Sequence, residues 1–356
     1  MRIMLVYYLY PDAGSAIDVH HYVRAAKELG HEIVVYGPPQ ENSLLPWSLD
    51  LESVDGLVFV FEWTQQLLRG GRIDLARMIA KVPRSRRIVI DCDGGYNARM
   101  DVEGDQNHKT DEDSRRWLEI ADCIADKIFQ PTPRPRRANV KTFFFHGYSQ
   151  SWERPLDLEE PSAKGKRDYG MVYVGHSKFR WKPMERVLDA IAPVRDKVGR
   201  LAIVGHGWDK MPEWAPKMGI ENQFRTDTDK LARMGVEFVP PCHFSKVIDW
   251  MSSAVFNPVI YRPLFADLSF VTCRTFETPA AGTIPLFGLD ESYVREIFGA
   301  AALELVLPKE RPEEKIRDMF ERRTHYACCV EKVRAHMRTR HDYEGRVRQL
   351  VDHLTA

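Results

Sequence analysis

Strands and helices alternate along the chain in two runs separated by a linker, and this pattern restricts the fold more than any other feature. Continuous apolar stretches, typical of strands covered on both faces, occur in the first run at 3–8, 33–36, 57–61, 88–90, 128–129 and 142–145. The second run repeats the pattern at 171–174, 201–204, 236–239 and 254–259. Helical periodicity between these stretches predicts an α/β protein with parallel sheets.

The linker at 152–167 contains two prolines and a run of charged residues, a composition that resists burial. A chain of 356 residues has room for two domains. We therefore expect two Rossmann-like domains facing each other, at 1–155 and 168–310, followed by helices at 311–356. The apolar stripes of these last helices fit either a return to the first domain or an oligomer contact.

The charge balance and the polar composition exclude several classes of partner. Lys plus Arg and Asp plus Glu number 51 each, so the net charge predicts no general attraction to nucleic acid or to an anionic membrane. No apolar run approaches the roughly 20 residues that span a bilayer, and the stretch at 3–8 is too short for a signal peptide. The six cysteines form no CxxC pair, and the histidines show no metal-ligand spacing. We expect a cytoplasmic protein with reduced thiols, no metal and no cofactor.

The segment 269–287 has the clearest functional pattern, a short helix followed by Gly282 and an apolar strand. Backbone N–H groups at the start of such a helix, at 269–272, make a natural diphosphate site. Arg274 adds a positive charge for phosphate oxygens. Glu277 lies within about one helical turn of them, where its carboxylate can accept both hydroxyls of a ribose. The alternative is that Glu277 is a solvated helix acid and Gly282 only a helix cap.

This segment resembles the donor-binding signature of GT-B glycosyltransferases, especially the R-x-F-E-x-x-A-x-G pattern of the group that includes bacterial spore-maturation-type proteins. The resemblance continues in other parts of the chain. Tyr173-Val174-Gly175-His176, followed by Arg180 and Lys182, is similar to the opening of the family's nucleotide domain, and Ile203-Val204-Gly205-His206-Gly207 to its next strand and turn. Gly14 and Gly30-His31-Glu32-Ile33 are similar to the family's first loop and second strand. The order and spacing of these pieces together are specific.

The resemblance implies a GT-B fold and a hexosyltransferase-like activity that uses a nucleotide-diphosphate sugar without a metal. Glu277 would hold the ribose, while Arg180 and Lys182 would face the diphosphate and neutralise the leaving group. The expected donor-binding residues are Gly14, Gly175, His176, Arg180, Lys182, Gly205, Ser269, Phe270, Val271, Thr272, Arg274 and Glu277.

Two departures from the family pattern keep other functions open. Ser269 stands where a two-Glu signature would place its first Glu, which normally contacts the donor sugar. Pro279 lies inside the expected helix, where it removes a backbone donor. A sugar-nucleotide epimerase of the same fold and a catalytically inactive GT-B-like binding protein are therefore the alternatives.

The acceptor side is expected on the first domain, because ligands of open α/β sheets collect at the carboxyl ends of strands. An inverting enzyme needs a base there, and the candidate catalytic residues are Asp93, Asp18 and His20. Each also has a structural interpretation: Asp18 suits a helix N-cap, and Asp93-Gly94 is typical of a turn. The sequence does not identify the sugar, the base or the acceptor, which can be a glycan, a small molecule or another compound.

Overall fold

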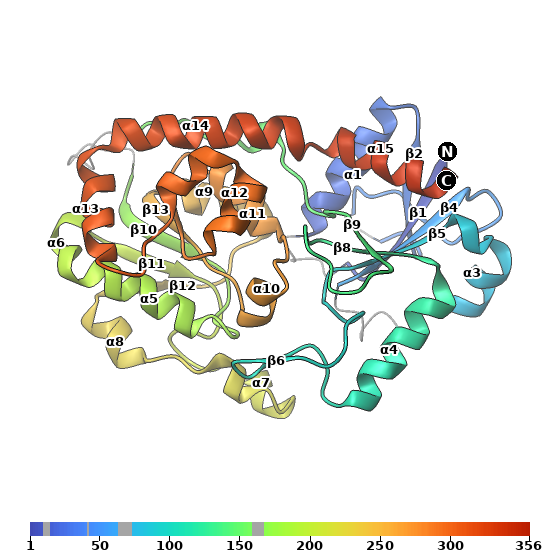
Figure 1. Ribbon diagram of the computed structural model, residues 1–356, viewed down its shortest axis with the longest axis horizontal. Coiled ribbons are helices and arrows are strands. Elements are labelled where there is room, and N and C mark those ends of the chain that lie inside the picture. The colour runs from blue at the N-terminus through green and yellow to red at the C-terminus, as the bar shows by residue number, and fades with distance from the viewer. Residues whose placement is uncertain (10–14, 41–42, 63–72, 159–166) are drawn as a thin grey trace. The chain divides into compact units, whose positions relative to one another are not determined.

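The computed structural model describes residues 1–9, 15–40, 43–62, 73–158 and 167–356 (Figure 1). The chain divides into two compact units. Unit 1 contains Met1–Gly147, Asp267–Cys273 and His341–Ala356, and unit 2 contains Tyr148–Ala266 and Arg274–Arg340. The segment 311–356 is shared between the two units, and its last part, His341–Ala356, belongs to unit 1, in agreement with the return to the first domain given as one alternative.

Unit 1 is built on a parallel sheet that has the order β3-β2-β1-β4-β5-β8-β9 among the described residues. Its strands are β1 (Arg2–Tyr7), β2 (Glu32–Tyr36), β3 (Trp47–Ser48), β4 (Gly56–Phe61), β5 (Arg87–Asp91), β8 (Lys127–Gln130) and β9 (Val140–Thr142). The prediction of a strand at 142–145 is wrong in register, because β9 ends at Thr142. Phe143 and Phe145 are core residues beyond that end.

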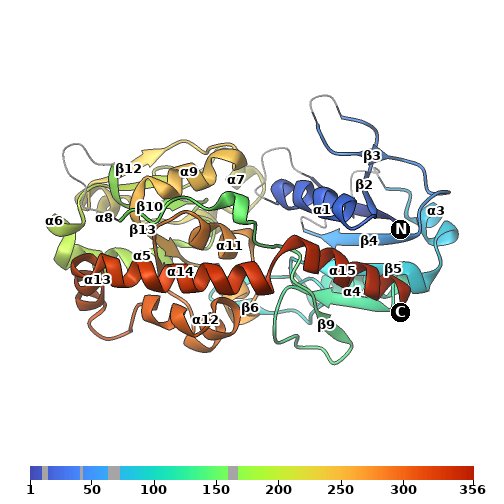
Figure 2. The same cartoon turned by 90° about the horizontal axis from the view of Figure 1, so that it is seen from above.

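The helices of unit 1 agree with the predicted alternation of strands and helices. They are α1 (Ala16–Glu28), α3 (Leu75–Lys81), η1 (Arg84–Arg86), α4 (Asp111–Ile124) and α15 (Tyr343–Thr355), and a hairpin is formed by β6 (Asp101–Val102) and β7 (Asp105–Gln106). Gly30 follows the end of α1 with φ of 75°, the left-handed conformation in which glycine commonly ends a helix. The last helix, α15, packs on α1 and β5 (Figures 1 and 2).

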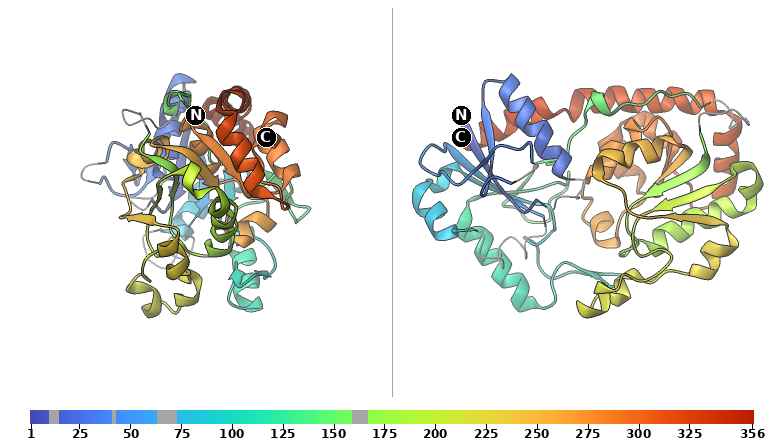
Figure 3. Two further views of the ribbon diagram at one scale, coloured as in Figure 1. Left: turned by 90° about the vertical axis from the view of Figure 1, so that its left-hand side faces the viewer. Right: turned by 180° about the vertical axis from the view of Figure 1, so that it is seen from behind.

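Unit 2 repeats the architecture with a parallel sheet of order β12-β11-β10-β13-β14 (Figure 3). Its strands are β10 (Tyr169–Val174), β11 (Leu201–Val204), β12 (Val236–Val239), β13 (Ala254–Val259) and β14 (Ile284–Phe287). Each lies on an apolar stretch that the sequence analysis identified. The reason is that strands covered by helices on both faces are apolar throughout.

Many short helices connect these strands. They are η2 (Gln150–Trp152), α5 (Trp181–Ile191), η3 (Ala192–Val194), α6 (Arg195–Val198), α7 (Trp214–Lys217), η4 (Glu221–Phe224), α8 (Thr228–Arg233), η5 (Phe244–Lys246), α9 (Val247–Ser252), α10 (Pro263–Asp267), α11 (Cys273–Ala280), α12 (Glu291–Phe298), η6 (Ala300–Leu305), α13 (Pro312–Glu321) and α14 (Arg323–Arg340). The stripe Val330, Val333 and Met337 of α14 is buried inside unit 2. The stripe of α15 is buried inside unit 1, so both stripes are covered within the chain, as the first of the two alternatives requires.

Both sheets have the strand order of a Rossmann-like fold. In each, the chain runs outward from a central strand in one direction and then starts again on its other side, so that a switch point lies between β1 and β4 in unit 1 and between β10 and β13 in unit 2. Ligands of open α/β sheets bind outside the carboxyl ends of strands at such points. None of the helices in the described part of the chain is long and apolar enough to cross a bilayer.

The buried side chain of His21 is expected to make the stability of unit 1 depend on pH. Its ring is buried on α1 and stacks on Tyr343 of α15, with ring centroids 4.7 Å apart. Burial, with a smaller contribution from the positive charge of Arg24, lowers the pKa of His21 from 6.5 to about 4. Between these two pKa values the unfolded chain binds more protons than the folded chain. The free energy of unfolding therefore falls as the pH falls from 6.5 towards 4.

We expect a loss of up to about 3 kcal/mol over this pH interval, at about 1.36 kcal/mol for each pKa unit. Urea denaturation at pH 7 and at pH 4.5 measures it. His21→Phe keeps the stacked ring and should reduce the pH dependence, whereas His243→Gln, at an exposed histidine, should not. An unchanged pH dependence in His21→Phe would contradict this assignment.

Candidate functional site

Two turns, one containing Gly175 and the other Gly205, pack against each other at the carboxyl ends of β10 and β11. Gly205 has φ of 149°, and a Cβ atom added to it would lie 2.3 Å from the carbonyl oxygen of Gly175. That oxygen also accepts a hydrogen bond of 2.7 Å from Nε1 of Trp208. Ser177 binds the second turn through its backbone N–H, which donates to the carbonyl of His206 at 3.0 Å. The two turns therefore form one close-packed backbone surface, and both glycines named by the sequence analysis belong to it.

Positive charges gather next to this surface. Nη1 of Arg180 lies 3.0 Å from Nδ1 of His176. Burial lowers the pKa of His176 well below its usual range, and the positive charges of Arg180, Lys178 and Arg262 lower it further. His176 is therefore neutral at pH 7 among three cations. These four residues, His176, Lys178, Arg180 and Arg262, are called the cationic cluster below.

The N-terminus of α5 follows the cationic cluster directly. Arg180 is the N-cap residue of this helix, and Lys182 is exposed in its first turn. The positive end of the helix dipole and the side chains of the cluster act in the same direction. A strand, a glycine turn and a helix N-terminus in this order form an anion-binding arrangement. The structure thus brings Gly175, His176, Arg180 and Gly205 together, as expected.

Phe179 holds the loop between β10 and α5 in an uncommon conformation. Its φ is 57°, and its backbone N–H donates to the carbonyl of Gln223 at 2.7 Å. The guanidinium of Arg262 lies 5.1 Å from the centre of its ring, and Nζ of Lys178 lies 5.8 Å from it. Strained backbone of this kind persists only where contacts on all sides fix it. The ring therefore holds two cations of the cluster in place.

Glu277 is buried, which overturns its interpretation as a solvated helix acid. It is 2% exposed on α11, and its Oε2 lies 2.8 Å from Nη1 of Arg274. The same Arg274 nitrogen donates to Sδ of Met251 at 3.3 Å. The two residues expected to hold ribose and phosphate are therefore ion-paired with each other. A ligand that binds there meets a preformed Arg–Glu pair.

Contacts at both ends hold α11 in position. Thr275, in the first turn, hydrogen-bonds Tyr261 at the end of β13. At the other end, Nε of Arg334 donates to the carbonyl of Pro279 at 2.8 Å. A Cβ atom on Gly282 would lie 2.5 Å from the carbonyl oxygen of Pro155. Gly282 is therefore required by close backbone packing as well as by its left-handed φ of 75°.

The segment before α11 differs in part from the phosphate site that the sequence analysis expected there. The backbone N–H of Val271 donates to the carbonyl of Pro131 at 2.7 Å, so it is used within unit 1. Phe270 and Val271 are buried in unit 1, and Ser269 is left-handed with φ of 55°. Of the expected backbone donors at 269–272, that of Val271 therefore serves to pack this segment. Thr272 is half-buried at the start of α11.

Asp18 is a core residue of unit 1 and not a helix cap. It is 1% exposed, and its two oxygens accept hydrogen bonds from Oη of Tyr343 at 2.6 Å and from Nδ1 of His146 at 3.0 Å. The N-cap of α1 is Ser15. With its carboxylate enclosed and paired in this way, Asp18 ties α15 to α1 and is not placed to take a proton from an acceptor. Its neighbour His20 is half-buried on α1, and burial lowers its pKa. Gly14, the remaining expected residue, lies outside the described residues.

Asp93 lines a cavity of about 60 Å³ at the carboxyl end of β5. Tyr96, Asn107, His108 and Trp117 are other lining residues. This cavity lies wholly within unit 1. The sequence analysis named only Asp93, because these other side chains come from the loop after β5, from the residues after β7 and from α4, with no motif to connect them.

The carboxyl edge of the unit 1 sheet is acidic. Burial raises the pKa of Cys92 well above its usual range, and the negative charges of Glu62, Asp91, Asp93 and Asp18 raise it further. Burial also raises the pKa of Asp91, while hydrogen bonds from Gln130, Tyr96 and Gly95 act in the opposite direction. Among the described residues, no group of His, Cys, Asp and Glu side chains is arranged to hold a metal ion.

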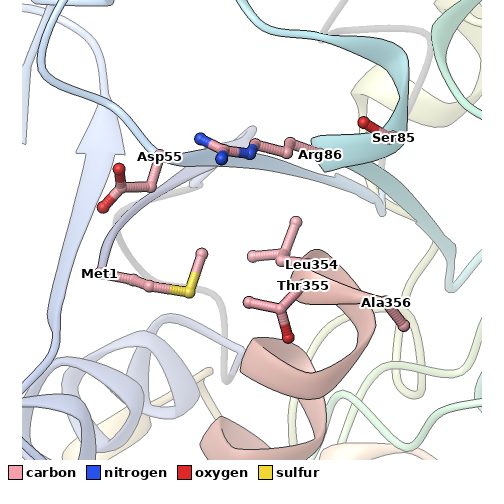
Figure 4. A pocket seen from close by; sticks show the side chains of 7 residues that line it. All are labelled: Met1, Asp55, Ser85, Arg86, Leu354, Thr355 and Ala356. Carbon is pink, nitrogen blue, oxygen red and sulfur yellow. The ribbon is translucent and has the colours of Figure 1, made fainter.

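A larger cavity, of about 400 Å³, lies at the other edge of the unit 1 sheet. Met1, Asp55 and Arg86 line it, together with Leu354 of α15 (Figure 4). These first three residues immediately precede β1, β4 and β5. The cavity therefore opens at the amino ends of the strands, opposite to the edge where such folds bind ligands.

Two Rossmann-like units of this kind make up the GT-B fold, and comparison with known proteins agrees. Residues 182–352 match the sequence model of a family described as glycosyl transferase-like. No curated protein matches the chain significantly.

Several solved structures share the fold over the whole chain. An alpha-glucosyltransferase in complex with UDP and a 13-mer DNA containing a HMU base has a TM-score of 0.62 and 13% identity, covering 100% of both chains. Sucrose-phosphate synthase from Thermosynechococcus elongatus has a TM-score of 0.61 and 14% identity, covering 99% of this chain and 97% of that one. The DNA modifying enzyme beta-glucosyltransferase has a TM-score of 0.59 and 12% identity, covering 100% of both. Identities this low establish the fold alone.

Proposed function

We propose that this protein is a glycosyltransferase that moves a sugar from a nucleotide-diphosphate donor to a hydroxyl acceptor. The observation that carries the proposal is the cationic cluster at the carboxyl end of β10, beside the Gly175 and Gly205 turns and the N-terminus of α5. The glycines of the two turns carry no side chains, so a diphosphate can approach their backbone. The positive charges of the cluster and the positive end of the helix dipole stabilise its negative charge. The family match over residues 182–352 supports the same conclusion.

The proposed chemistry follows from the charge that develops on the leaving group. When the bond between the sugar and the diphosphate breaks, the diphosphate gains negative charge. Arg180, Lys178 and Arg262 are fixed before the reaction and stabilise that charge without reorganising. Glu277 accepts hydrogen bonds from the ribose hydroxyls in this proposal, and its ion pair with Arg274 orients the carboxylate.

The acceptor hydroxyl needs a base if the reaction inverts the configuration of the sugar. Asp93 is the proposed base, since it is half-buried and lines a cavity. His20 is the second candidate, because its lowered pKa keeps it neutral at pH 7 and able to accept a proton. We further propose a uridine diphosphate sugar as the first donor to test, because two of the similar structures are titled with UDP or uridine diphosphoglucose. We also propose that the protein acts in the reducing cytoplasm, because its six cysteines are free thiols.

The test is calorimetry with UDP, GDP, TDP and ADP, followed by turnover of the corresponding glucose nucleotides. We expect binding of at least one diphosphate and release of free nucleotide during transfer. An epimerase would keep the nucleotide attached to the sugar, and an inactive binding protein would bind without turnover. Arg180→Gln should weaken diphosphate binding, whereas Arg233→Gln, at an exposed residue on α8, should not. If none of the four nucleotides binds, the proposal is wrong.

Removing divalent metals is expected to leave turnover within about twofold of its original rate. The physical reason is that, in this proposal, the cations of the cluster take the role that a metal would otherwise have in neutralising the leaving group. Turnover is measured before and after treatment with excess EDTA, with Mg²⁺ and Mn²⁺ added back separately. A loss of turnover that either metal restores would show that the cationic cluster is not sufficient.

A further inference from the structure

We infer that His108 is the base that takes the proton from the acceptor hydroxyl, and that Asp91 positions it through one peptide group of the backbone. The inference rests on the proposed function and adds a third residue to the two candidate bases named there, Asp93 and His20. It is carried by a chain of hydrogen bonds within unit 1 and by the cavity that His108 lines.

A single peptide group, which joins Gly95 to Tyr96, lies between Asp91 and His108. Its N–H, on Tyr96, donates to Oδ2 of Asp91 at 2.8 Å, and its carbonyl oxygen, on Gly95, lies 2.7 Å from Nε2 of His108. Hydrogen bonds at the two ends of one peptide group polarise each other. The negative charge of Asp91 therefore strengthens the carbonyl as an acceptor for the ring. The arrangement is that of a carboxylate–histidine pair with one peptide group inserted.

The groups that contact the carboxylate of Asp91 are hydrogen-bond donors. Its Oδ1 accepts from the backbone N–H of Gly95 at 2.9 Å, and its Oδ2 also accepts from Nε2 of Gln130 at 2.8 Å. Burial raises the pKa of Asp91, and these donors act in the opposite direction because they favour the ionised form. Asp91 thus stands at the buried end of the chain as an acceptor held on both oxygens.

This chain determines which nitrogen of His108 is basic. A carbonyl oxygen can only accept, so Nε2 carries the hydrogen, and the neutral ring has its lone pair on Nδ1. Nδ1 makes no hydrogen bond in the described part of the chain. The side chain is 5% exposed and lines the cavity of about 60 Å³ at the carboxyl end of β5. Nδ1 is therefore the atom that can accept a proton from a hydroxyl bound there.

The residues on either side of His108 hold it in place. Before it, Nδ2 of Asn107 donates to the carbonyl of Gly94 at 3.1 Å. After it, the side chain of Thr110 accepts from the backbone N–H of Asp113 at 3.0 Å and caps α4. Both ends of the segment are fixed before any ligand binds, so the ring is oriented without rearrangement during the reaction.

The proposed step transfers one proton and one sugar. The acceptor oxygen forms a bond to the sugar carbon, the bond from that carbon to the diphosphate breaks, and the electron pair leaves with the diphosphate. The hydroxyl proton passes to Nδ1, which turns His108 into an imidazolium. The polarised carbonyl of Gly95 stabilises this positive charge, with Asp91 behind it. His108 then releases the proton to water.

The experiment measures the release of nucleotide from UDP-glucose, or from whichever of the four glucose nucleotides turns over. The acceptors are water and ethanediol, because a cavity of this size has room for a few water-sized groups. His108→Gln can still donate to the carbonyl of Gly95 but has no basic nitrogen. We expect it to lower kcat at least about 100-fold, the lower end of the contribution of a general base, with an unchanged dissociation constant for the nucleoside diphosphate.

Chemical rescue separates a proton acceptor from a structural side chain. Added imidazole should restore part of the turnover of His108→Ala and should not raise that of the wild type. Lys109→Gln, at the exposed next residue, should change neither turnover nor nucleotide affinity. Circular dichroism checks that the variants fold.

A double-mutant cycle tests Asp91 as a positioning residue. Asp91→Asn should lower kcat in the wild-type background and have no further effect in His108→Gln, because a residue that acts only through His108 then has nothing left to orient. A purely structural role would lower kcat by the same factor in both backgrounds.

The outcomes separate this inference from the proposed function. Turnover of His108→Gln close to that of the wild type would refute the inference and leave the glycosyltransferase proposal intact. A loss in His108→Ala that imidazole does not restore, with Asp91→Asn acting equally in both backgrounds, would show that His108 serves the fold, and the inference would be wrong. A wild type that releases no nucleotide from any of the four donors would refute the proposed function itself.

Discussion

Replacing Gly205 with alanine is expected to abolish nucleotide binding by unit 2. The added Cβ would lie 2.3 Å from the oxygen and 2.7 Å from the carbon of the Gly175 carbonyl, and 3.2 Å from the backbone nitrogen of His176. All three are backbone atoms, so no side chain can rotate away. The two turns must separate, at a cost of roughly 1–3 kcal/mol for overpacking with a further penalty for the φ of 149°.

The free energy of unfolding is measured by urea denaturation, and nucleotide affinity by calorimetry. Gly288→Ala is the matched control in the same unit, because its Cβ would meet only ordinary contacts of 3.6 and 3.9 Å. We expect the control to change little. A Gly205→Ala protein that binds nucleoside diphosphate normally would show that the glycine turns are not part of the donor site.

Removing the Glu277 carboxylate is expected to have two separate effects. Glu277→Ala leaves the Arg274 guanidinium, itself largely covered, without its ion-pair partner, which costs roughly 3–5 kcal/mol where a pair is fully buried and less here. It also removes a charge-assisted hydrogen bond to ribose worth about 1.5–3 kcal/mol. Nucleotide binding should weaken roughly 10- to 150-fold, at about 1.4 kcal/mol for each tenfold change.

A second variant distinguishes the two effects. Arg274→Met/Glu277→Gln removes both charges and should recover much of the lost stability without recovering nucleotide affinity. Glu291→Ala, at an exposed acid on α12, is the control for charge. A 2′,3′-dideoxy nucleotide should bind the wild type poorly and bind Glu277→Ala about as well as the normal nucleotide does. Equal loss of affinity for both nucleotides on Glu277→Ala would show that Glu277 supports the fold and does not contact ribose.

The sequence was sufficient for the features that depend on local patterns. Parallel strands buried on both faces are continuous apolar runs, so β1, β4 and β10 to β14 lie on predicted stretches. Gly175 and Gly205 follow two of these strands directly, so the edge to which they belong could be predicted. The start of α11 was also predicted within a few residues, because a glycine and an apolar strand mark its end.

The features that the sequence did not reveal depend on contacts between distant residues. Asp18 was expected to be a cap or a catalytic base, but its partner Tyr343 lies 325 residues further along the chain. Lys178 and Arg262 join the same cluster only because β10 and β13 pair. The burial of Val271 depends on Pro131, and no local pattern indicates that contact.

The division of the chain between the units has a consequence for how the protein folds during synthesis. Unit 1 begins at Met1, yet it also contains Asp267–Cys273 and His341–Ala356. Its first 147 residues are synthesised well before the helix that covers α1 and β5, which follows all of unit 2 along the chain. Unit 2 needs no residue beyond Arg340, so it has all of its parts before unit 1 does. Until α15 has been synthesised, the nascent Met1–Gly147 part of unit 1 exposes the apolar surface that α15 later covers, and that surface is where chaperones would bind.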